Sequence, residues 1–339
     1  MSFTDSEIIE INKVTDLFPK GTELSVAKII DKTPFYYGTL NSGTGIQQKN
    51  NSGDVFEIGS ITKIFTAYLL AQMTVDGDVE IDASINSILP FSIKGNAEIT
   101  LRELATHTSG LPRLPPGIIW QALFSNKDNP YKNYTEDKLL NYLENKLKVN
   151  SKGKIVYSNL GAGILGYILS IYSKCSYNEL LTKKLFSVLN MFNSSASRDK
   201  INSRLVQGID TKGQPAINWE LGVLEGAGAV LSSTEDLAKF ALANFDPSNK
   251  VMNYQRATAF ENDSECLSLG WFILDKPEEG ERMYFHNGGT GGYSSAMLLD
   301  IKNNNAFIIL SNISGLHKLK GQKVDELVFH LMSNIVNKY

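Results

Sequence analysis

The sequence predicts an α+β protein, in which one antiparallel sheet is flanked by N- and C-terminal helices and carries an inserted, mostly helical lobe. Three observations predict this class. Alternating stretches rich in β-branched residues lie near the N-terminus and again over residues 268–310. Helical patches separated by polar loops fill residues 82–220. Amphipathic helical patterns occupy both ends of the chain, so they can cover a sheet that is built from both ends.

The N-terminal part of the chain begins with helix and strand patterns in turn. Apolar residues at helical spacing predict a first helix, and two alternating segments around a polar turn predict a hairpin. A short strand then leads through Gly59 into an apolar helix that begins at Ser60. In order, these elements are a helix at residues 6–17, strands at 23–30, 35–40 and 55–58, and a helix at 60–74.

The remaining elements divide the chain into two lobes. A capping-box pattern of Ser232 and Glu235 predicts a helix over residues 232–242. We expect a single domain, residues 1–339, with an α/β lobe of residues 1–81 and 221–339 and a helical lobe of residues 82–220. The other predicted helices lie at residues 101–106, 136–147, 160–171, 177–189 and 318–337, and the other strands at 268–274, 283–286, 294–299 and 306–310.

The composition excludes several classes of function. The net charge is −3 and no long run of Lys or Arg occurs, which excludes nucleic acid as a partner because phosphates need a basic face. No apolar run reaches about 18 residues, so no membrane span is predicted. No G-x-S-x-G, P-loop or metal-ligand cluster occurs. The sequence therefore predicts neither an α/β-hydrolase nor a bound nucleotide, cofactor or metal.

The cysteines and the N-terminus bear on the cellular compartment. Cys175 and Cys266 share no motif with each other or with a histidine, and whether they pair stays open. The N-terminus lacks a basic stretch followed by an apolar run, which predicts a cytoplasmic protein. Had a leader been removed, the protein would be periplasmic or secreted instead.

The first motif with chemical content is Ser60-Ile-Thr-Lys63, an S-x-x-K pair. Three other such pairs begin at Ser25, Ser151 and Ser197, within a strand pattern or in polar loops. Only Ser60 opens an apolar helix after a strand and a glycine, where positions i and i+3 share a face and bring the amine to the hydroxyl. The start of the helix also offers free N–H groups. The alternative interpretation is an N-capping serine beside a solvated lysine.

The second motif is Tyr157-Ser-Asn159, which precedes the small-residue helical pattern LGAGILGYIL. A similar Y-x-N, Tyr131-Lys-Asn133, lies in a polar run, so we expect Tyr131 to be exposed. For Tyr157 the alternative interpretation is a packed tyrosine whose hydroxyl is hydrogen-bonded.

The third motif is His286-Asn287-Gly288, which continues as Gly289-Thr-Gly-Gly between two strand patterns. Glycines at this place allow a backbone to approach a ligand closely and leave N–H groups for an oxyanion. The alternative is a glycine-rich hairpin with an incidental histidine. We interpret the other histidines as structural: His107, His317 and His330.

In this order, the three motifs resemble the serine beta-lactamase and penicillin-binding-protein superfamily. The nearest branch is the class C beta-lactamase-like one, which includes DD-carboxypeptidases, D-aminopeptidases and esterases. The resemblance implies one catalytic domain with the beta-lactamase/transpeptidase-like fold and a site between its lobes. The segments that carry it span about residues 50–312: FEIGSITKIFTAYLLAQM, LRELATHTSGLP, YSNLGAGILGYIL, GAGAVLSSTEDLAKF and HNGGTGGYSS.

The resemblance implies a serine hydrolase that acts through an acyl-enzyme. Ser60 would be the nucleophile, activated by Lys63 and Tyr157. The backbone N–H groups of Ser60 and Gly289 would form the oxyanion hole. No cofactor is implied. The expected partner is a small-molecule or peptide substrate, and the oligomeric state stays open.

The remaining motif residues would contact the substrate. The resemblance implies that Asn159 orients Lys63 and the substrate amide. Class C beta-lactamases usually carry Lys-Thr-Gly where this chain has His286, Asn287 and Gly288. The histidine form resembles peptidases and esterases of the family, which implies a DD-carboxypeptidase-, D-peptidase- or esterase-like activity on a peptide, amide or ester. The alternatives are a class C-type beta-lactamase, a penicillin-binding protein that acylates with little turnover, and a pseudoenzyme.

The protonation of this site stays open at the level of the sequence. Lys63 and Tyr157 both need a lowered pKa to act as a base, and one shared effect cannot fully shift both, so the pair is expected to titrate as a unit. Either residue can then be the general base. We expect His286 to titrate near pH 6.5, which predicts an activity that depends on a group titrating between about pH 5.5 and 7.5.

Overall fold

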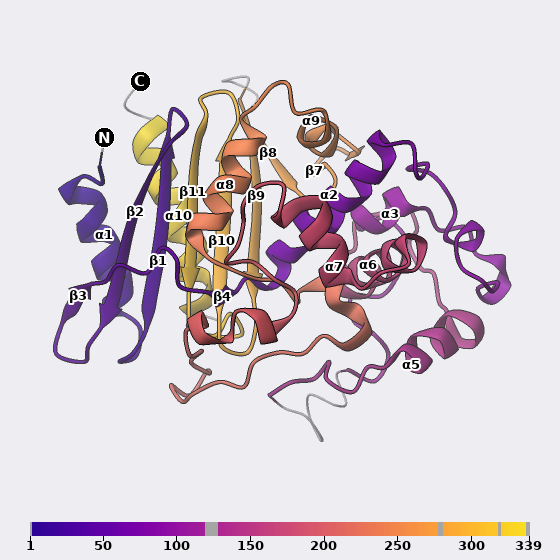
Figure 1. Ribbon diagram of the computed structural model, residues 1–339, viewed down its shortest axis with the longest axis horizontal. Coiled ribbons are helices and arrows are strands. Elements are labelled where there is room, and N and C mark those ends of the chain that lie inside the picture. The colour runs from indigo at the N-terminus through magenta and orange to yellow at the C-terminus, as the bar shows by residue number, and fades with distance from the viewer. Residues whose placement is uncertain (1, 119–127, 277–280, 318–319, 337–339) are drawn as a thin grey trace.

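The computed structural model describes residues 2–118, 128–276, 281–317 and 320–336. Within these residues nine strands form one antiparallel sheet, in the order β3-β2-β1-β11-β10-β9-β8-β7-β6. Figure 1 shows that β1 and β11, from opposite ends of the chain, lie side by side in this sheet. The strands are β1 (Glu23–Ile30), β2 (Thr33–Asn41), β3 (Ile46–Gln48), β6 (Phe260–Glu261), β7 (Cys266–Leu267), β8 (Phe272–Lys276), β9 (Glu281–Gly289), β10 (Ser294–Asp300) and β11 (Asn305–Ser311).

Helices surround the sheet, and a separate two-stranded ladder pairs β4 (Phe56–Glu57) with β5 (Leu231–Ser232). This ladder matters for the site because β4 leads directly into the turn that carries Ser60. The helices are α1 (Asp5–Asp16), α2 (Thr62–Val75), α3 (Leu101–Ala105), α5 (Glu136–Asn141), α6 (Asn159–Ser173), α7 (Tyr177–Leu181), α8 (Thr234–Asn244), α9 (Lys250–Arg256) and α10 (Lys320–Val336).

The two faces of the sheet are covered by different helices. The terminal helices α1 and α10 pack on one face, and α8 packs on the other (Figure 1). Along β10, Ala296 and Leu298 face the terminal helices, whereas Met297 and Leu299 belong to the hydrophobic cluster on the other face. The predicted α+β architecture is confirmed, with terminal helices beside an antiparallel sheet. The exact boundaries of the two lobes stay a prediction.

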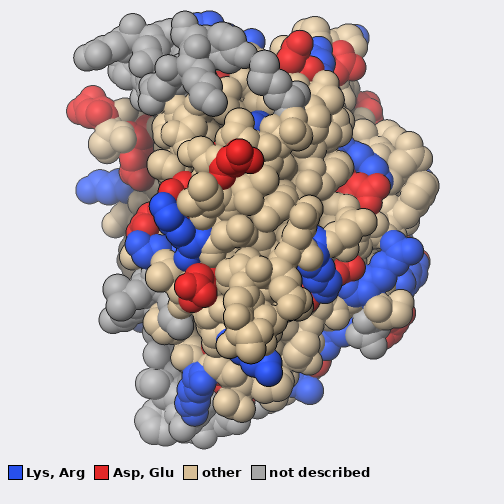
Figure 2. Space-filling view, turned by 90° about the vertical axis from the view of Figure 1, so that its left-hand side faces the viewer, with Lys and Arg blue, Asp and Glu red and all other residues tan. Residues whose placement is uncertain are grey.

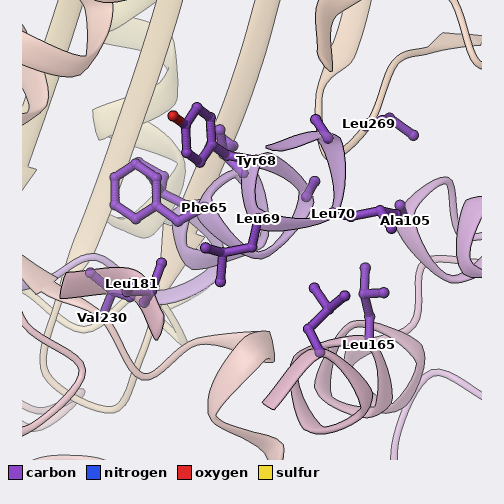
Figure 3. Packing of buried hydrophobic residues seen from close by; sticks show 14 of the residues in the cluster. Phe65, Tyr68, Leu69, Leu70, Ala105, Leu165, Leu181, Val230 and Leu269 are labelled. Carbon is purple, nitrogen blue, oxygen red and sulfur yellow. The ribbon is translucent and has the colours of Figure 1, made fainter. Parts of the chain in front are cut away.

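Helix α2 is the centre of the larger hydrophobic cluster. Its side chains are buried on almost every side, as is typical of a helix that is apolar all round. Figure 3 shows side chains of α2 among residues contributed by α3, α6 and α7 and by the segments near Val230 and Leu269. The N-terminal end of α2, next to Ser60, is therefore anchored by both the helical part and the sheet part of the molecule.

Two local predictions are wrong. The predicted strand at residues 268–274 begins only at Phe272, as β8, because a turn at Gly270 separates β8 from β7. Gly270 has φ +78°, and a Cβ on it would lie 2.9 Å from the backbone of α2. The predicted capping box is displaced by one residue. Ser232 lies in β5, and Ser233 caps α8 by accepting a hydrogen bond from the N–H of Asp236.

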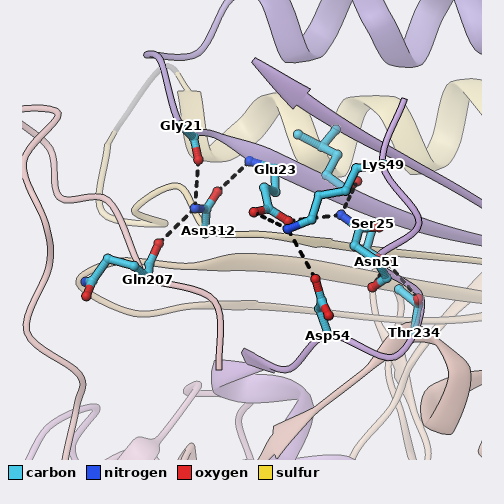
Figure 4. A network of polar contacts seen from close by, with 10 residues as sticks. Gly21, Glu23, Ser25, Lys49, Asn51, Asp54, Gln207, Thr234 and Asn312 are labelled. Carbon is cyan, nitrogen blue, oxygen red and sulfur yellow. Dashed lines mark hydrogen bonds and ion pairs between the residues drawn. The ribbon is translucent and has the colours of Figure 1, made fainter. Parts of the chain in front are cut away.

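A buried polar network ties the first strand to the chain that returns from the helical lobe (Figure 4). Asn312 accepts a hydrogen bond from the N–H of Glu23 at 2.7 Å. Its amide donates to the carbonyl oxygens of Gly21 and Gln207 at 3.1 and 2.8 Å. Lys49 binds the Glu23 carboxylate at 2.7 Å. These bonds fix the end of β11 against the segment that leads from the helical lobe toward the site.

The surface beside β2 and β3 carries basic and acidic side chains interspersed with one another (Figure 2). In the described parts of the chain, no helix combines the length and the apolar character that crossing a bilayer requires. Cys175 and Cys266 are not joined by a disulfide.

Candidate active site

Ser60 lies in a tight turn between β4 and α2. The turn, Gly59–Ile61, is a single 3-10 turn, and α2 begins two residues after Ser60 rather than at it. Gly59 has φ +51°, and a Cβ on it would lie 2.7 Å from the backbone nitrogen of Gly289. Glycine is therefore required here both by the left-handed backbone and by the close approach of β9.

The backbone of β9 touches this turn at the third motif. A Cβ on Gly288 would lie 2.1 Å from the carbonyl oxygen of Ile58 and 2.9 Å from the backbone nitrogen of Ser60. Ser60 and Gly289 line one small pocket of about 30 Å³. The two backbone segments that were predicted to form an oxyanion hole thus lie next to each other.

Lys63 lies one helical turn beyond Ser60 and is only 3% exposed. Its Nζ lies 2.9 Å from Ser60 Oγ and donates to the carbonyl oxygen of Ala227 at 2.6 Å. Burial lowers the pKa of Lys63 well below its ordinary value, and the charge of Arg113 lowers this pKa further. The amine is therefore biased toward its neutral form, in which it can accept a proton.

Tyr157 lies two residues before the start of α6 and contacts both Ser60 and Lys63. Its phenol is hydrogen-bonded with Ser60, and Lys63 Nζ lies 5.0 Å from the centroid of its ring. Burial raises the pKa of Tyr157, against smaller opposing effects of the Ser60 hydrogen bond and of the Arg113 charge. The structure brings Ser60, Lys63 and Tyr157 together, with the phenol biased toward its protonated form.

His107 contacts the segment that carries Tyr157. Its ring centroid lies 4.5 Å from that of Tyr157, and its Nδ1 accepts a hydrogen bond from the N–H of Ser158 at 3.2 Å. Burial, followed by the charge of Lys63, lowers the pKa of His107 well below its ordinary value. A neutral His107 with a lone pair on Nδ1 fits the structural role that the sequence predicted for it.

Asn159 begins α6 and lines the same pocket as Ser60. Its Nδ2 donates to the hydroxyl of Tyr131 at 3.0 Å, and its Oδ1 is buried without a hydrogen-bond partner among the described residues. Lys63 is instead held by the Ala227 carbonyl. Asn159 thus lies in the site, but its side chain bonds Tyr131 and does not make the predicted contact with Lys63.

Tyr131 is a pocket residue that the sequence interpretation missed. The prediction that it is exposed is wrong, because it is only 3% exposed and its ring lies 5.5 Å from that of Trp219, centroid to centroid. Both residues line the Ser60 pocket. The polar run around Tyr131 gave no signal for this burial. The Y-x-N spacing shared with Tyr157 was the only sequence feature that could have drawn attention to it.

His286 faces the site from β9 but does not have the predicted titration. It is 1% exposed, and its ring centroid lies 5.5 Å from that of Phe272 and 6.2 Å from that of Tyr157. Burial lowers the pKa of His286 to about 3, with a further contribution from the charge of Lys63. The prediction that His286 titrates near pH 6.5 is therefore wrong, since desolvation outweighs the hydrogen bond between Nδ1 and the Asn287 carbonyl.

Asn287 points away from Ser60. Its side-chain amide donates to the carboxylate of Asp325 in α10 at 2.6 Å. Successive side chains of a strand face opposite sides, so the residue after His286 faces the terminal helices. The predicted substrate contact of the Asn287 side chain is therefore wrong, and the motif contributes His286 and the backbone of Gly288 and Gly289 to this side of the sheet.

Arg113 is the second residue that the sequence interpretation did not select. Its guanidinium carbon lies 5.1 Å from the centroid of the Tyr157 ring, and its carbonyl oxygen accepts from the N–H of Asn159 at 2.9 Å. Its charge acts on the pKa values of Lys63 and Tyr157. It directly follows the segment HTSGLP, which had been noted only for its family resemblance.

The donor set of this site suits acyl transfer rather than metal binding. Across the ranges that the structure describes, no three His, Cys, Asp or Glu side chains are grouped so that they could hold a metal ion. The site offers a hydroxyl, a neutral amine, a phenol and clustered backbone N–H groups. These are the groups that a serine nucleophile and a developing oxyanion need.

Comparison with known proteins agrees with this chemistry. The model of the beta-lactamase family matches residues 23–327. The chain is 26% identical over 322 residues to Protein flp of Staphylococcus aureus (strain N315), covering 88% of this chain and 60% of that protein. It is 24% identical over 330 residues to the D-alanyl-D-alanine-carboxypeptidase/endopeptidase AmpH of Escherichia coli (strain K12), covering 88% of this chain and 81% of that protein.

A solved structure shows the same fold. The class C beta-lactamase of Rhodobacter sphaeroides superposes with a TM-score of 0.79 at 18% identity, covering 97% of this chain and all of that one. The present chain spans about 60% of the length of the curated Staphylococcus aureus relatives that it matches. Because the family model covers most of the chain, the protein belongs to the beta-lactamase family.

Proposed function

We propose that this protein hydrolyses a peptide, amide or ester through an acyl-enzyme on Ser60, with Lys63 as the general base. The observation that carries the proposal is the 2.9 Å separation between Lys63 Nζ and Ser60 Oγ in surroundings that lower the pKa of Lys63 well below its ordinary value. A neutral amine at hydrogen-bond distance from a hydroxyl satisfies the geometric and the electrostatic requirements for a base.

In the first step, Lys63 accepts the hydroxyl proton as Ser60 Oγ forms a bond to the substrate carbonyl carbon. The negative charge that develops on the carbonyl oxygen is stabilised by the backbone N–H groups of Ser60 and Gly289. The bond to the leaving group then breaks, and the leaving group takes a proton from the Lys63–Tyr157 pair. In the second step, water gives up a proton to the same pair as its oxygen forms a bond to the acyl carbon. The bond between that carbon and Ser60 Oγ then breaks, the pair returns the proton to Oγ, and the acid product leaves.

Tyr157 acts in this scheme as a proton donor rather than as a phenolate. Its pKa is raised by burial, so the phenol keeps its proton at neutral pH. Its hydrogen bond with Ser60 brings the phenol to the oxygen that becomes the ester, from where it can pass a proton to the leaving group. The two residues therefore divide the roles: Lys63 takes the first proton, and Tyr157 relays one to the leaving group.

The substrate class that we favour is a D-alanyl-type peptide or a small ester. Class C beta-lactamases usually carry a lysine where this chain has His286, and burial keeps His286 neutral. AmpH, which bears the name D-alanyl-D-alanine-carboxypeptidase/endopeptidase, is similar over 88% of this chain. A class C-type beta-lactamase and a penicillin-binding protein with slow deacylation are the alternatives.

A substrate panel tests the proposal. Initial rates would be measured for a D-alanyl-D-alanine peptide, a p-nitrophenyl ester and a cephalosporin, with wild type, Ser60→Ala and Ser197→Ala. Ser197 begins another S-x-x-K pair of the chain and serves as the matched control. We expect turnover of the peptide or the ester that Ser60→Ala abolishes and Ser197→Ala retains.

Mass spectrometry separates the alternatives. After a brief exposure to penicillin, a lasting adduct on Ser60 without turnover of any substrate would favour the slow-deacylation alternative. Rapid cephalosporin hydrolysis would favour the beta-lactamase. Full activity of Ser60→Ala on every substrate would remove Ser60 from the mechanism and overturn the proposal.

A further inference from the structure

A cavity of about 770 Å³ is much larger than the Ser60 pocket of about 30 Å³. The two share no lining residue, but Arg113 lines the large cavity and lies beside Tyr157. The large cavity is formed by the loop after α3, by the segment that follows α5 and by Lys94, which precedes α3. It is called the basic cavity below.

All the charged residues that line the basic cavity are positively charged. Its lining includes Lys94, Arg113, Lys146 and Lys148, and none of its lining residues is an Asp or a Glu. No ion pair joins these four cations to a carboxylate among the residues that the structure describes. On the surface beside β2 and β3, by contrast, the two signs are interspersed (Figure 2). A concave site that is lined by positive charges alone attracts an anion and raises its local concentration.

Part of the cavity lining is apolar. Pro112, Leu114 and Pro115 contribute to the lining between the basic side chains. A ligand that fits both properties has an apolar body and an anionic end, because the lysine and arginine stems cover apolar surface while their charged ends stay at the rim. A carboxylate is the group that the planar guanidinium of Arg113 binds best, through two parallel hydrogen bonds.

The position of Arg113 connects this cavity to the nucleophile. Its guanidinium carbon and Lys63 Nζ lie 5.1 and 5.0 Å from the centroid of the same Tyr157 ring. The carbonyl oxygen of Arg113 is held by the N–H of Asn159, so the loop that carries the guanidinium is fixed to the site. An anion bound by Arg113 would therefore lie about one aromatic ring away from the reacting centre.

The position on β9 where class C beta-lactamases usually carry a lysine has no cation in this chain. His286 stands where related enzymes usually have a lysine, and it is buried against Phe272 and Tyr157. The Asn287 side chain is bonded to Asp325 on the other face of the sheet. Neither of these two side chains therefore offers a positive charge to an anionic group, whereas the Arg113 guanidinium beside Tyr157 does.

We infer that the basic cavity binds an anionic group of the substrate, a carboxylate, and that Arg113 is the residue that determines this specificity. The inference rests on the proposed function, because it assumes that Ser60 is the nucleophile. It adds that the preferred substrate carries a carboxylate next to an apolar segment, on either the acyl or the leaving-group side of the scissile bond.

Matched pairs of esters test the inference. The first pair is mono-p-nitrophenyl glutarate and its methyl ester, which differ in a charge on the acyl side. The second pair is the butyryl ester of 3-hydroxybenzoate and of methyl 3-hydroxybenzoate, which differ in a charge on the leaving-group side. The measured quantity is the ratio of kcat/KM for the charged ester to kcat/KM for its neutral partner, which cancels effects on Lys63 that both esters share.

We expect wild type to favour the charged ester of one pair, and the pair that responds identifies the side of the bond. Arg113→Gln should lower that ratio about tenfold, as expected for the loss of a charge-assisted hydrogen bond. Arg113→Lys should restore most of it, and Lys146→Gln and Lys148→Gln should each lower it about twofold. Lys212→Gln, an exposed lysine outside the cavity, should leave it unchanged. Raising the salt concentration from 50 to 500 mM should reduce the wild-type ratio.

A binding measurement covers the case in which the esters are turned over slowly. Titration calorimetry with monomethyl glutarate is expected to give a Kd about tenfold weaker for Arg113→Gln than for wild type, both checked for native circular dichroism. Ratios and Kd values that do not differ between wild type and Arg113→Gln would overturn the inference while leaving Ser60-dependent hydrolysis intact. Loss of the proposed function itself would show differently, as turnover that survives Ser60→Ala.

Discussion

The amine of Lys63 donates a hydrogen bond to the carbonyl oxygen of Ala227 at 2.6 Å, although 164 residues separate them in sequence. This bond holds one N–H of the amine and leaves Nζ 2.9 Å from Ser60 Oγ. A neutral amine has a single lone pair, so an amine anchored in this way can direct it at the Ser60 hydroxyl. The same burial that makes Lys63 a base makes its charged form costly for the folded protein.

Lys63→Met is therefore expected to separate activity from stability. Loss of the general base should lower kcat/KM by roughly 10²–10⁴-fold. Because the folded-state pKa of Lys63 is lowered, the unfolded chain binds more protons, and wild-type stability falls as the pH drops below the ordinary lysine range. Methionine carries no charge and avoids this loss, so the gain in unfolding midpoint should be larger at pH 5.5 than at pH 9.

The control for this substitution is Lys212→Met, which removes an exposed lysine far from the pocket residues. It should change neither kcat/KM nor the pH dependence of the unfolding midpoint. A Lys63→Met protein that keeps near-wild-type turnover, or whose stability gain is the same at both pH values, would show that the amine is neither the base nor a buried charge.

His286 is expected to stay neutral across the working pH range. Burial lowers its pKa to about 3, so it loses its proton well below pH 5 and has nothing left to titrate at higher pH. The profile of kcat/KM against pH should have the same inflections between pH 5.5 and 7.5 in wild type and in His286→Gln, even if the plateau is lower. His330→Gln, on the outer helix α10, controls for the removal of a histidine. An inflection that only His286→Gln removes would contradict the burial.

Gly288→Ala probes the contact between β9 and the Ser60 turn. The added Cβ would meet the carbonyl oxygen of Ile58 at 2.1 Å. The Cβ is attached to the backbone of β9 and the oxygen belongs to the backbone before Ser60, so neither can move without its chain segment. The strand must shift away from Ser60, so we expect kcat/KM to fall by at least about 10²-fold, the cost of losing one oxyanion donor. Gly53→Ala, where the nearest atom would be 3.5 Å away, is the matched control and should keep full activity. Equal activity of the two variants would show that β9 does not constrain the turn.

Part of this site was predictable from sequence for a local reason. Ser60 and Lys63 are three residues apart at the start of an apolar helix, so their proximity follows from helix geometry alone. Asn287 was mispredicted although a local signal existed. Its neighbour His286 faces the site, and a strand cannot direct two successive side chains to one face.

The remaining errors have a tertiary origin. Tyr131 lies in a polar run without periodicity, and its burial is produced by Trp219, 88 residues further along the chain. The Ala227 carbonyl is a backbone group, so no side chain marks it. The low pKa of His286 follows from how deeply Phe272 and Tyr157 bury it, which no spacing within β9 reveals.

Glu225 is expected to destabilise the folded protein once the pH is high enough to ionise its buried carboxyl group. Burial raises its pKa from an ordinary value of 4.5 to about 7. The folded protein therefore holds this proton more tightly than the unfolded chain, and stability is lost as the pH rises through this interval. Glu225→Gln keeps the neutral shape and should raise the free energy of unfolding by about 3 kcal/mol at pH 8, with little effect at pH 4.5.

Chemical denaturation at the two pH values measures this effect. Glu220→Gln, an exposed neighbour five residues earlier, should change neither value. A stabilisation by Glu225→Gln that is equal at pH 4.5 and pH 8 would mean that the carboxyl is not the titrating group.

The ion pair between Glu7 and Lys28 is expected to matter only as a pair. Both carboxylate oxygens of Glu7 lie within 2.8 Å of Lys28 Nζ, and each side chain is only 4% exposed. Glu7→Leu leaves a buried ammonium without its partner, which should cost about 3–5 kcal/mol of unfolding free energy, while the double variant Glu7→Leu/Lys28→Met should recover most of that loss. The exposed pair of Glu10 and Lys13 has the same 2.7 Å separation, so Glu10→Leu isolates the effect of burial and should stay within the error of the measurement. Denaturant unfolding of these three variants and of wild type measures the effect. A Glu7→Leu protein as stable as Glu10→Leu would mean that water reaches Lys28 and that the terminal helix α1 is not held down by this contact.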